Sequence, residues 1–391
     1  MSNRDFIDSF VGMIREVFST NEFVPLHAPC FGDFEKELVL ETLTSTFVSS
    51  VGQFVNEFEA QLAQYTGAGF VVATNTGTAA LHTALHLLGV RSTDEVITTP
   101  LTFVATCNSI SYCGARPVFI DVDQDTLGLS PAKLAGFLEE YGEIRDDGFC
   151  WNKFSESVIR ACVPVHNLGH SAKIEEIAAI CTKYNIPVIE DAAESLGSRR
   201  NNVHTGRRGL MGTLSFNGNK IITTGGGGAL ITDDEVLAQR ARHISTTAKL
   251  SHPWLFKHDE VGFNYRLPNL NAALGCAQMK QLDRFVSEKR QLAAHYDKWL
   301  EDWPQASFFS ESPNSRSNYW LNAILLNDLA ARDEFLDRTN RVGVMTRPMW
   351  TPMHTLPMYQ SCQRTDLTNA EWIEERLVNI PSSATKLSTN E

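Results

Sequence analysis

The sequence predicts an α/β fold in which a mostly parallel sheet lies between layers of helices, followed by a smaller α+β domain. Short apolar segments alternate with amphipathic helical segments between residues 70 and 232, which is typical of parallel strands joined by helices. Near residue 269 this alternation gives way to a long helical segment and two strand-like segments. We therefore expect a large domain at residues 1–260 and a small C-terminal domain at residues 261–391.

The first predicted element is an amphipathic helix at residues 5–18, which we assign to the large domain. Its apolar side chains, which include Phe6, Phe10 and Ile14, recur at the spacing of one helical face. We expect this helix to pack on the body of the protein, unlike a signal peptide. No apolar run reaches the roughly 18 residues of a membrane-spanning helix, so no membrane segment is expected.

The strands expected for the large sheet are apolar and are separated by turns or helices. They lie at residues 70–74, 95–99, 117–121, 158–165, 187–191, 214–216 and 229–232. Helices are expected at residues 33–65, 79–88, 100–112, 173–184, 269–300 and 329–339, and small-domain strands at 319–326 and 342–347. The Ser/Thr/Asn-rich tail after Pro381 predicts disorder. Because ligands bind at the carboxyl ends of parallel strands, residues that follow the strands are the first candidates for a site.

Composition and charge argue against several classes of protein. Apolar residues make up 43% of the chain and charged residues 20%, which is ordinary for a globular protein. The net charge of −12 and the lack of a Lys/Arg run argue against a nucleic-acid-binding protein. The eight cysteines include no CxxC pair, which argues against a zinc site and fits a reducing cytoplasm. We therefore expect a cytoplasmic protein without a metal ion.

Lys220 stands between a short polar turn and a run of four glycines, Gly225 to Gly228. The flanking apolar pairs Ile221-Ile222 and Leu230-Ile231 predict that the chain leaves one buried strand here and returns into another. A partly desolvated lysine loses its proton more readily and can attack a carbonyl to form a Schiff base. A lysine that snorkels out of a hairpin explains the same pattern equally well.

Two further candidates follow strands of the expected sheet. Gly77 and Thr78 stand at a strand-to-helix junction, where free N–H groups and the helix dipole suit a phosphate, although a simple N-cap would look the same. Asp191 ends the strand at 187–191 and could either cap the next turn or keep a ring nitrogen protonated.

Phe103 follows another strand and is either a core aromatic or a platform for a flat ring. Together with Lys220, Asp191, Ser215 and the Gly77-Thr78 turn, it describes a ligand with a phosphate, a basic ring nitrogen and an aldehyde. That ligand is pyridoxal phosphate (PLP). No GxGxxG follows the first strand and the glycine run lacks the GxxxxGK[ST] spacing, so a dinucleotide or a P-loop is a poor alternative.

The chain resembles the fold-type I PLP enzymes of the DegT/StrS family of nucleotide-sugar aminotransferases. The resemblance extends from about residue 24 to residue 360 and rests on an ordered set of segments. These lie at residues 47–58 (FVSSVGQFVNEF), 77–81, 94–97, 102–106, 117–121, 190–193, 215–228, 262–266 and 347–350.

The resemblance implies a role for each residue of the cofactor site. Lys220 would form the Schiff base, Asp191 would pair with the pyridine nitrogen and Phe103 would stack on the ring. The phosphate would be held by Gly77, Thr78 and Ser215, with Asn264 reaching it from the neighbouring subunit, which implies a homodimer with shared sites. Glu194 stands near the phenolic oxygen, where many relatives carry Gln or His, and its role is open.

The resemblance also suggests contacts to the sugar nucleotide. Arg347 is the first of these candidates, because a guanidinium suits a pyrophosphate. The others are His354, Trp254, Tyr319, Arg266 and His166. Each could equally be a core or interface residue.

The implied reaction is transamination by a ping-pong mechanism. L-glutamate would donate its amine, leaving pyridoxamine phosphate as an intermediate, and a nucleotide-linked 4-keto-6-deoxy sugar would accept it. Segments 216–225 and 250–254 are similar to enzymes of legionaminic-acid or bacillosamine-type pathways, which favours a UDP-linked sugar. The alternatives are a sugar dehydratase, whose relatives carry His in place of Lys220, and a non-catalytic regulator with the same fold.

Overall fold

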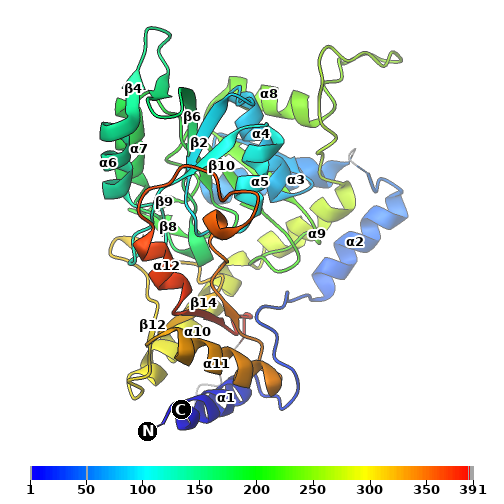
Figure 1. Cartoon of the computed structure of the whole chain (residues 1–391). Coiled ribbons are helices and arrows are strands. Elements are labelled where there is room, and N and C mark those ends of the chain that lie inside the picture. The colour runs from blue at the N-terminus through cyan, green and yellow to red at the C-terminus, as the bar shows by residue number, and fades with distance from the viewer. Residues whose placement is uncertain (1, 50–51, 386, 388–391) are drawn as a thin grey trace.

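The computed structural model describes residues 2–49, 52–385 and 387. Residues 386 and 388–391 of the tail with predicted disorder lie outside the described residues. The chain forms a large α/β domain and a smaller α+β domain. In Figure 1 the large domain is in the upper part of the view and the small domain in the lower part. The predicted fold class is confirmed.

The large domain is built on a central sheet of seven strands in the order β1-β11-β10-β7-β6-β2-β3. The sheet pairings join β1 through β7 and β3 through β6, and bridges from Cys162 to Val188 and from Val165 to Asp191 connect β6 with β7. Apart from β11, neighbouring strands run parallel. The strands are β1 (Phe70–Thr74), β2 (Asp94–Thr98), β3 (Arg116–Phe119), β6 (Ser157–Val163), β7 (Ile189–Asp191), β10 (Met211–Ser215) and β11 (Gly228–Thr232).

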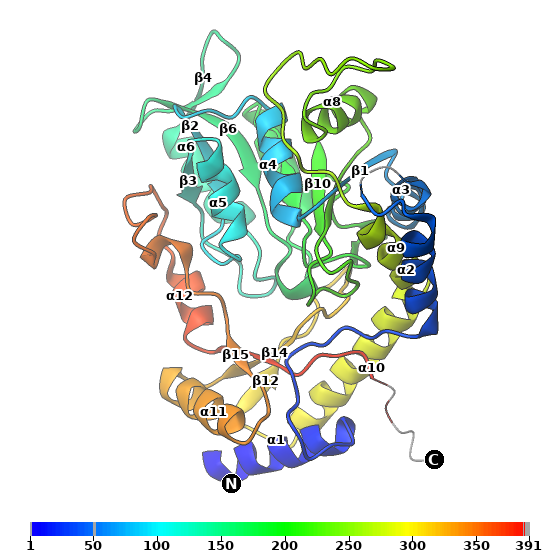
Figure 2. The ribbon, with the colours of Figure 1, turned by 90° about the vertical axis from the view of Figure 1, so that its right-hand side faces the viewer.

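Helices cover both faces of this sheet. Successive strand residues point to opposite faces, and in these strands both sets of side chains are apolar and buried. Val96 packs with α4 (Gly77–Leu87), α5 (Ala105–Tyr112) and α8 (Glu235–Ser245). Its neighbour Ile97 packs with α6 (Pro131–Tyr141) and α7 (Ile174–Lys183) on the other face. In Figure 2, α4 and α5 lie in front of the strands. Two short strands, β4 (Gly142–Ile144) and β5 (Cys150–Asn152), extend the sheet from β6.

The small domain has a four-stranded antiparallel sheet in the order β12-β14-β16-β15. Its strands are β12 (Ala306–Phe308), β14 (Asn322–Leu326), β15 (Arg347–Pro348) and β16 (Leu377–Ile380), and its helices are α10 (Leu282–Leu300), α11 (Leu329–Arg341) and α12 (Thr368–Glu374). A three-stranded ribbon of β13 (Ser315–Arg316), β8 (Arg199–Arg200) and β9 (Val203–His204) joins it to the large domain.

The N-terminal helix α1 (Asn3–Val17) packs on the small domain, which differs from the predicted domain assignment. Phe6 and Phe10 are buried against Phe335 of α11, and Ile14 shares their cluster with Tyr296 of α10. Figures 1 and 2 both place α1 beside α11, far from the large sheet. An amphipathic helix shows which of its faces is apolar, but its sequence does not specify the partner that buries this face.

Two predicted helices are each divided in two. Residues 33–65 form α2 (Asp33–Ser45) and α3 (Gln53–Thr66), and residues 269–300 form α9 (Asn269–Met279) and α10. α9 lies against α2 and α3 at the side of the large domain. The segment that contains Ile221-Ile222 is a run of buried turns between β10 and β11, not a strand.

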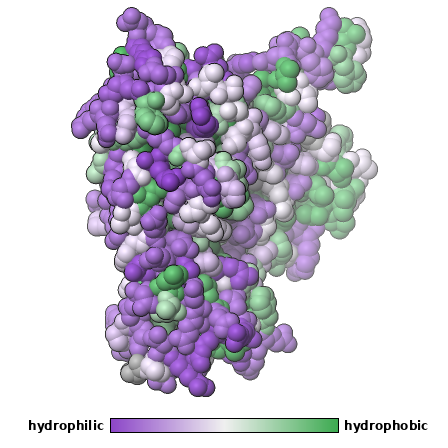
Figure 3. All heavy atoms as spheres, viewed as in Figure 1, coloured by the Kyte–Doolittle hydropathy of each residue, from purple (hydrophilic) through white to green (hydrophobic). Residues whose placement is uncertain are grey.

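Several elements were not predicted, including α6, α8, α12 and the short turns η1 (Asn167–Gly169) and η2 (Met353–Thr355). Among the described residues, no helix is long and apolar enough to cross a membrane. The loop after α8 projects from the large domain in Figure 1, and Figure 3 shows apolar surface on this loop and on α2. The large exposed apolar side chains of the projecting loop are Leu250, Trp254, Leu255, Phe256 and Val261.

Candidate functional site

A cavity of about 290 Å³ lies at the carboxyl ends of the parallel strands, where the large domain faces the small one. The loops after β1, β2, β6, β7 and β10 supply most of its wall, which is the place where ligands bind in sheets of this kind. The wall consists of Thr76, Gly77, Thr78, Leu81, Thr102, Phe103, Ala105, Thr106, Val165, Asp191, Ala193, Glu194, Ser215, Asn217, Asn219, Lys220, Gly226, Gly227, Trp320 and Trp350.

The start of α4 forms one end of this cavity. The side chain of Thr76 caps the helix by accepting a hydrogen bond from the backbone N–H of Ala79 at 3.0 Å. A Cβ added to Gly77 would lie 2.8 Å from the Cβ of Ser215, so glycine is needed for the helix start to approach Ser215. The first N–H groups of the helix and the hydroxyls of Thr78 and Ser215 therefore border one space, which suits a phosphate.

Asp191 is the last residue of β7, and its carboxylate is fixed on both oxygens. Thr106 donates a hydrogen bond to Oδ2 at 2.8 Å, and the backbone N–H of Ala193 donates to Oδ1 at 3.1 Å. The side chain is buried and faces the cavity. A carboxylate held in this way can keep a heteroaromatic nitrogen protonated.

Lys220 brings a buried amine to the same cavity. Its Nζ lies 3.6 Å from Oε1 of Glu194 and 3.8 Å from the centre of the Trp320 ring. Burial lowers the pKa of Lys220 from its ordinary value, and the carboxylates of Glu194 and Asp191 offset part of this effect. A lysine in such an environment is suited to attack a carbonyl carbon.

Glu194 is a buried carboxyl group next to the amine of Lys220. Its Oε2 accepts a hydrogen bond from the backbone N–H of Leu168 at 2.8 Å. Burial raises the pKa of Glu194, and the positive charge of Lys220 acts in the opposite direction. Glu194 therefore faces the reactive amine directly, a placement that the sequence left open.

Phe103 is 53% exposed and lines the cavity, so it is not a core residue. Its ring is inclined to the ring of Trp350 by 61°, with 5.5 Å between the ring centres. Both aromatic side chains line the cavity, and an aromatic ring in this position suits a flat ligand.

The residues present fit PLP. The helix start with Thr78 and Ser215 can hold the phosphate, Asp191 can pair with the ring nitrogen, and Lys220 can bond to the aldehyde carbon. Most of this set was predicted from the sequence, and the structure brings it into one cavity. When bound, PLP supplies an electron sink that stabilises negative charge on a substrate carbon.

Two predicted substrate residues lie outside the cavity wall. His166 is fully buried, accepts a hydrogen bond from Ala172 N on Nδ1 and contacts Glu190 through Nε2 at 2.8 Å. Tyr319 is buried, and its hydroxyl accepts a hydrogen bond from Glu311 N at 3.2 Å. Both side chains therefore stabilise the fold around the site and do not reach into it.

The remaining predicted contacts lie at the surface or have other partners. Arg347 is exposed and donates to Asn340 Oδ1 at 2.9 Å, and His354 lies 3.4 Å from Glu371. Trp254 is 75% exposed at the projecting loop. Neither Asn264 nor Arg266 lines the cavity, and both are exposed.

Sequence analysis missed seven polar or aromatic residues of the wall, three of which are Thr76, Thr102 and Thr106. Trp320 and Trp350 come from the small domain, and Asn217 and Asn219 belong to the turn before Lys220. The two asparagines could have been found from their position in the turn. The tryptophans lie in or beside segments that predict strands, so their sequence context indicates only burial.

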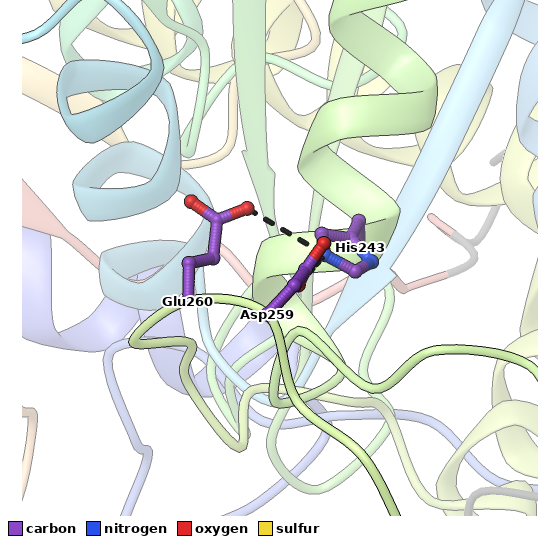
Figure 4. Close-up of side chains that lie close together, drawn as sticks. All are labelled: His243, Asp259 and Glu260. Atoms are coloured by element: carbon purple, nitrogen blue, oxygen red, sulfur yellow. Dashed lines mark hydrogen bonds and ion pairs between the residues drawn. The ribbon is translucent and has the colours of Figure 1, made fainter.

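A second cluster of titratable groups lies at the base of the projecting loop. His243 of α8 lies 2.7 Å from Asp259 and 3.5 Å from Glu260 (Figure 4). These three groups are close enough to share a metal ion. Glu260 is already bound on both oxygens by the guanidinium of Arg240, so we interpret the cluster as ion pairs that tether the loop to α8.

Comparison with known proteins agrees with this site. The sequence model of the DegT/DnrJ/EryC1/StrS aminotransferase family matches residues 29–391. The chain is 38% identical over 335 residues to EpsN of Bacillus subtilis, described as a PLP-dependent aminotransferase, which covers 85% of this chain and 83% of EpsN. It is 35% identical over 362 residues to GDP-perosamine synthase of Escherichia coli O157:H7, which covers 92% and 93% of the two chains.

Solved structures agree in fold. The aminotransferase TlmJ of Streptoalloteichus hindustanus superposes with a TM-score of 0.83 at 28% identity, covering 92% of this chain and 93% of TlmJ. The fold is that of the fold-type I PLP enzymes, as the sequence predicted. The chain therefore belongs to the DegT/DnrJ/EryC1/StrS aminotransferase family and is a PLP-dependent transaminase.

Proposed function

We propose that this chain transfers the amine of L-glutamate to the C4 ketone of a nucleotide-linked 4-keto-6-deoxy sugar, giving a 4-amino-4,6-dideoxy sugar nucleotide. The observation that carries the proposal is the buried amine of Lys220, placed in one cavity with Asp191 and the phosphate-binding helix start. A histidine in place of Lys220 would point to the dehydrating relatives, so the lysine favours amine transfer.

Each residue of the set has a defined task in this proposal. Lys220 would hold the cofactor at its aldehyde carbon, and once glutamate has displaced it, its amine would take the Cα proton of glutamate and deliver it to that cofactor carbon. Asp191 keeps the ring nitrogen protonated, with Thr106 holding its carboxylate in place. Phe103 supports the ring, while Glu194 lies on the side of the Lys220 amine.

The cavity is too small to hold a whole sugar nucleotide beside the cofactor. Its volume of about 290 Å³ is at the lower end of small-ligand pockets. The nucleotide and its pyrophosphate would therefore extend past Phe103 and Trp350 to the surface. Arg347, His354 and Trp254 stay proposals for this outer part of the ligand.

The nucleotide is proposed to be GDP, where sequence analysis favoured UDP. The reason is that a relative covering nearly the whole chain at 35% identity bears the name GDP-perosamine synthase. The cavity residues face the sugar and the cofactor, so they do not discriminate between the two nucleotides.

We also propose that the active form is a homodimer with shared sites. Trp254, Phe256 and Val261 are 75%, 80% and 84% exposed on the projecting loop. Large apolar side chains that gather on one loop are typical of an interaction surface, and Figure 3 shows a further apolar patch on α2. Asn264 follows the loop and is exposed, so it is free to reach the phosphate of a second copy.

The proposal is tested with a panel of GDP-, UDP- and dTDP-linked 4-keto-6-deoxy sugars and L-glutamate. We expect 2-oxoglutarate and a 4-amino sugar nucleotide in equal amounts, with the GDP-linked sugar converted fastest. Loss of a sugar hydroxyl without release of 2-oxoglutarate would instead identify a dehydratase. A chain that binds PLP but converts no sugar or glutamate would identify a regulator.

A further inference from the structure

The ring of Trp320 covers the amine of Lys220 from the small-domain side. The Nζ atom lies 3.8 Å from the ring centre, and the tryptophan is only 1% exposed. We propose that Trp320 is a positioning residue that fixes the amine of Lys220 and favours its positively charged form. The inference rests on the proposed role of Lys220 as the cofactor-bonding residue.

Trp320 holds the backbone before Lys220 as well as its amine. The indole Nε1 donates a hydrogen bond to the carbonyl oxygen of Asn219 at 2.7 Å. Lys220 in turn donates its backbone N–H to Asn217 O at 3.0 Å, which closes the turn. The side chain of Trp320 therefore contacts both the backbone next to Lys220 and the amine at the end of the Lys220 side chain.

Asn318 connects Trp320 to the other side of the site. Asn318 is fully buried, and its Oδ1 accepts a hydrogen bond from the backbone N–H of Trp320 at 2.8 Å. Its Nδ2 donates to Glu194 O at 3.0 Å and to Leu196 O at 2.9 Å. Asn318 is thus hydrogen-bonded to the backbone of both Glu194 and Trp320, whose side chains contact the Lys220 amine.

Lys289 holds the backbone of Trp320 by a hydrogen bond. It is a fully buried lysine of α10, and its amine donates to the carbonyl oxygens of Trp320 at 3.0 Å, Tyr319 at 3.5 Å, and Ser382. Tyr319 itself has a φ of 47°, which is uncommon for a residue with a side chain. A buried amine bonded to three carbonyl groups and a strained residue next to Trp320 indicate that the position of Trp320 is tightly specified.

The contact between the Trp320 ring and the Lys220 amine favours the charged form of the amine. The face of an indole ring is negative and attracts a cation, more strongly when the pair is desolvated. Glu194 and Asp191 act in the same direction, whereas burial acts against the charged form. His27 is a further titratable group near this amine: burial lowers its pKa, and the charges of Lys289 and Lys220 act in the same direction.

Two substitutions separate the ring from its N–H group. Trp320→Phe keeps an aromatic face of weaker charge and loses the hydrogen bond to Asn219, and Trp320→Leu loses both. Trp303→Leu is a control, because it removes a tryptophan that packs on Trp299 in the small domain. Circular dichroism checks that all three variants are folded.

The protonation of Lys220 is measured on the full-length chain stripped of cofactor. The rate at which acetic anhydride acylates Lys220 is followed against pH by mass spectrometry of its peptide. We expect the midpoint to fall by about 0.4–1.5 pH units in Trp320→Leu, less in Trp320→Phe, and not in the control. An unchanged or raised midpoint in Trp320→Leu would overturn the proposal.

The loaded enzyme gives a second, independent measurement. The pH midpoint of the visible absorbance of bound PLP should move in the same direction and order. Borohydride reduction and peptide mapping show separately whether Lys220 is the attachment residue. Mapping to another lysine would refute the proposed function, whereas the acylation midpoint would still decide the role of Trp320.

Discussion

The hydroxyl of Thr106 donates a hydrogen bond of 2.8 Å to Oδ2 of Asp191, joining the start of α5 to the end of β7 inside the cavity. Asp191 N also bonds to the carbonyl oxygen of Pro164, next to β6. The start of α5 and the ends of β6 and β7 therefore determine the direction of one carboxylate. Under the proposed function this direction matters, because the carboxylate would meet a ring nitrogen whose position is set by a phosphate at the start of α4.

Replacing Asp191 by Asn should leave the fold intact and remove most of the activity. The amide has the same shape but no charge, so it cannot keep the ring nitrogen protonated. We expect the rate of the glutamate half-reaction to fall by about 10²-fold or more, measured by stopped-flow absorbance. PLP should still bind weakly, because the helix start at Gly77 is unchanged.

Thr106→Ser is the matched control for this carboxylate, and Thr106→Val tests the hydrogen bond itself. A hydrogen bond to a charged group contributes about 1.5–3 kcal/mol. Thr106→Val should therefore lower the half-reaction rate by about 10- to 100-fold, while Thr106→Ser stays near wild type. Equal rates in all three proteins would show that Asp191 does not depend on Thr106.

Replacing Lys220 by Ala should abolish both turnover and the covalent bond to the cofactor. No other amine lines the described cavity, so no neighbouring lysine can replace it. Borohydride reduction followed by mass spectrometry should find PLP on the Lys220 peptide of the wild type and no adduct in the variant. Lys183→Ala, at an exposed lysine at the end of α7, should behave like the wild type.

The cofactor-binding half of the site could be predicted because its residues stand at strand ends. Asp191 ends β7 and Gly77 lies three residues after β1, and parallel strands bring their carboxyl ends to one edge of the sheet. Chain order alone therefore places these residues together. The same reasoning located Phe103 after β2.

The substrate half could not be predicted, because it depends on side-chain direction and on packing between the domains. Trp320 lies 100 positions from Lys220 and reaches it only through the docking of the small domain. Arg347 was chosen for its guanidinium group, but the structure directs that group to Asn340. The packing of α1 on α11 could not be predicted either, because it also depends on tertiary packing.

Gly77→Ala should weaken cofactor binding more than it weakens the fold. The added Cβ would lie 2.8 Å from the Cβ of Ser215, so the helix start and the hydroxyl must separate where the phosphate binds. We expect the Kd for PLP to rise at least about tenfold, measured by fluorescence quenching. That rise corresponds to about 1.4 kcal/mol.

Gly136→Ala is the control for the change in Gly77, because a Cβ there meets nothing within 4 Å inside α6. It should leave the Kd for PLP unchanged and raise the free energy of unfolding by about 0.5–1 kcal/mol. If both variants bind PLP equally well, the phosphate does not lie at the start of α4.

Stability should fall as the pH is lowered from about 6.5 to about 4, because two buried histidines resist protonation. Burial lowers the pKa of His170 to about 4, and the pKa of His204 to about 4 as well. Between these values and the unfolded value near 6.5, the unfolded chain binds more protons than the native protein. The histidines' contribution to stability is therefore complete above pH 6.5 and is lost as the pH falls to about 4.

His170 provides the variant that tests this pH dependence. Neither of its ring nitrogens has a hydrogen-bond partner among the described residues, and its ring packs edge-on against Phe309 and Tyr319. His170→Phe should therefore lose little stability at pH 7.5 and should show a smaller decrease in the free energy of unfolding between pH 7.5 and pH 5. Urea unfolding at both pH values measures this decrease, and His295→Ala, at an exposed position, should keep the wild-type decrease. A His170→Phe variant with the full wild-type decrease would show that His170 is not a source of the acid sensitivity.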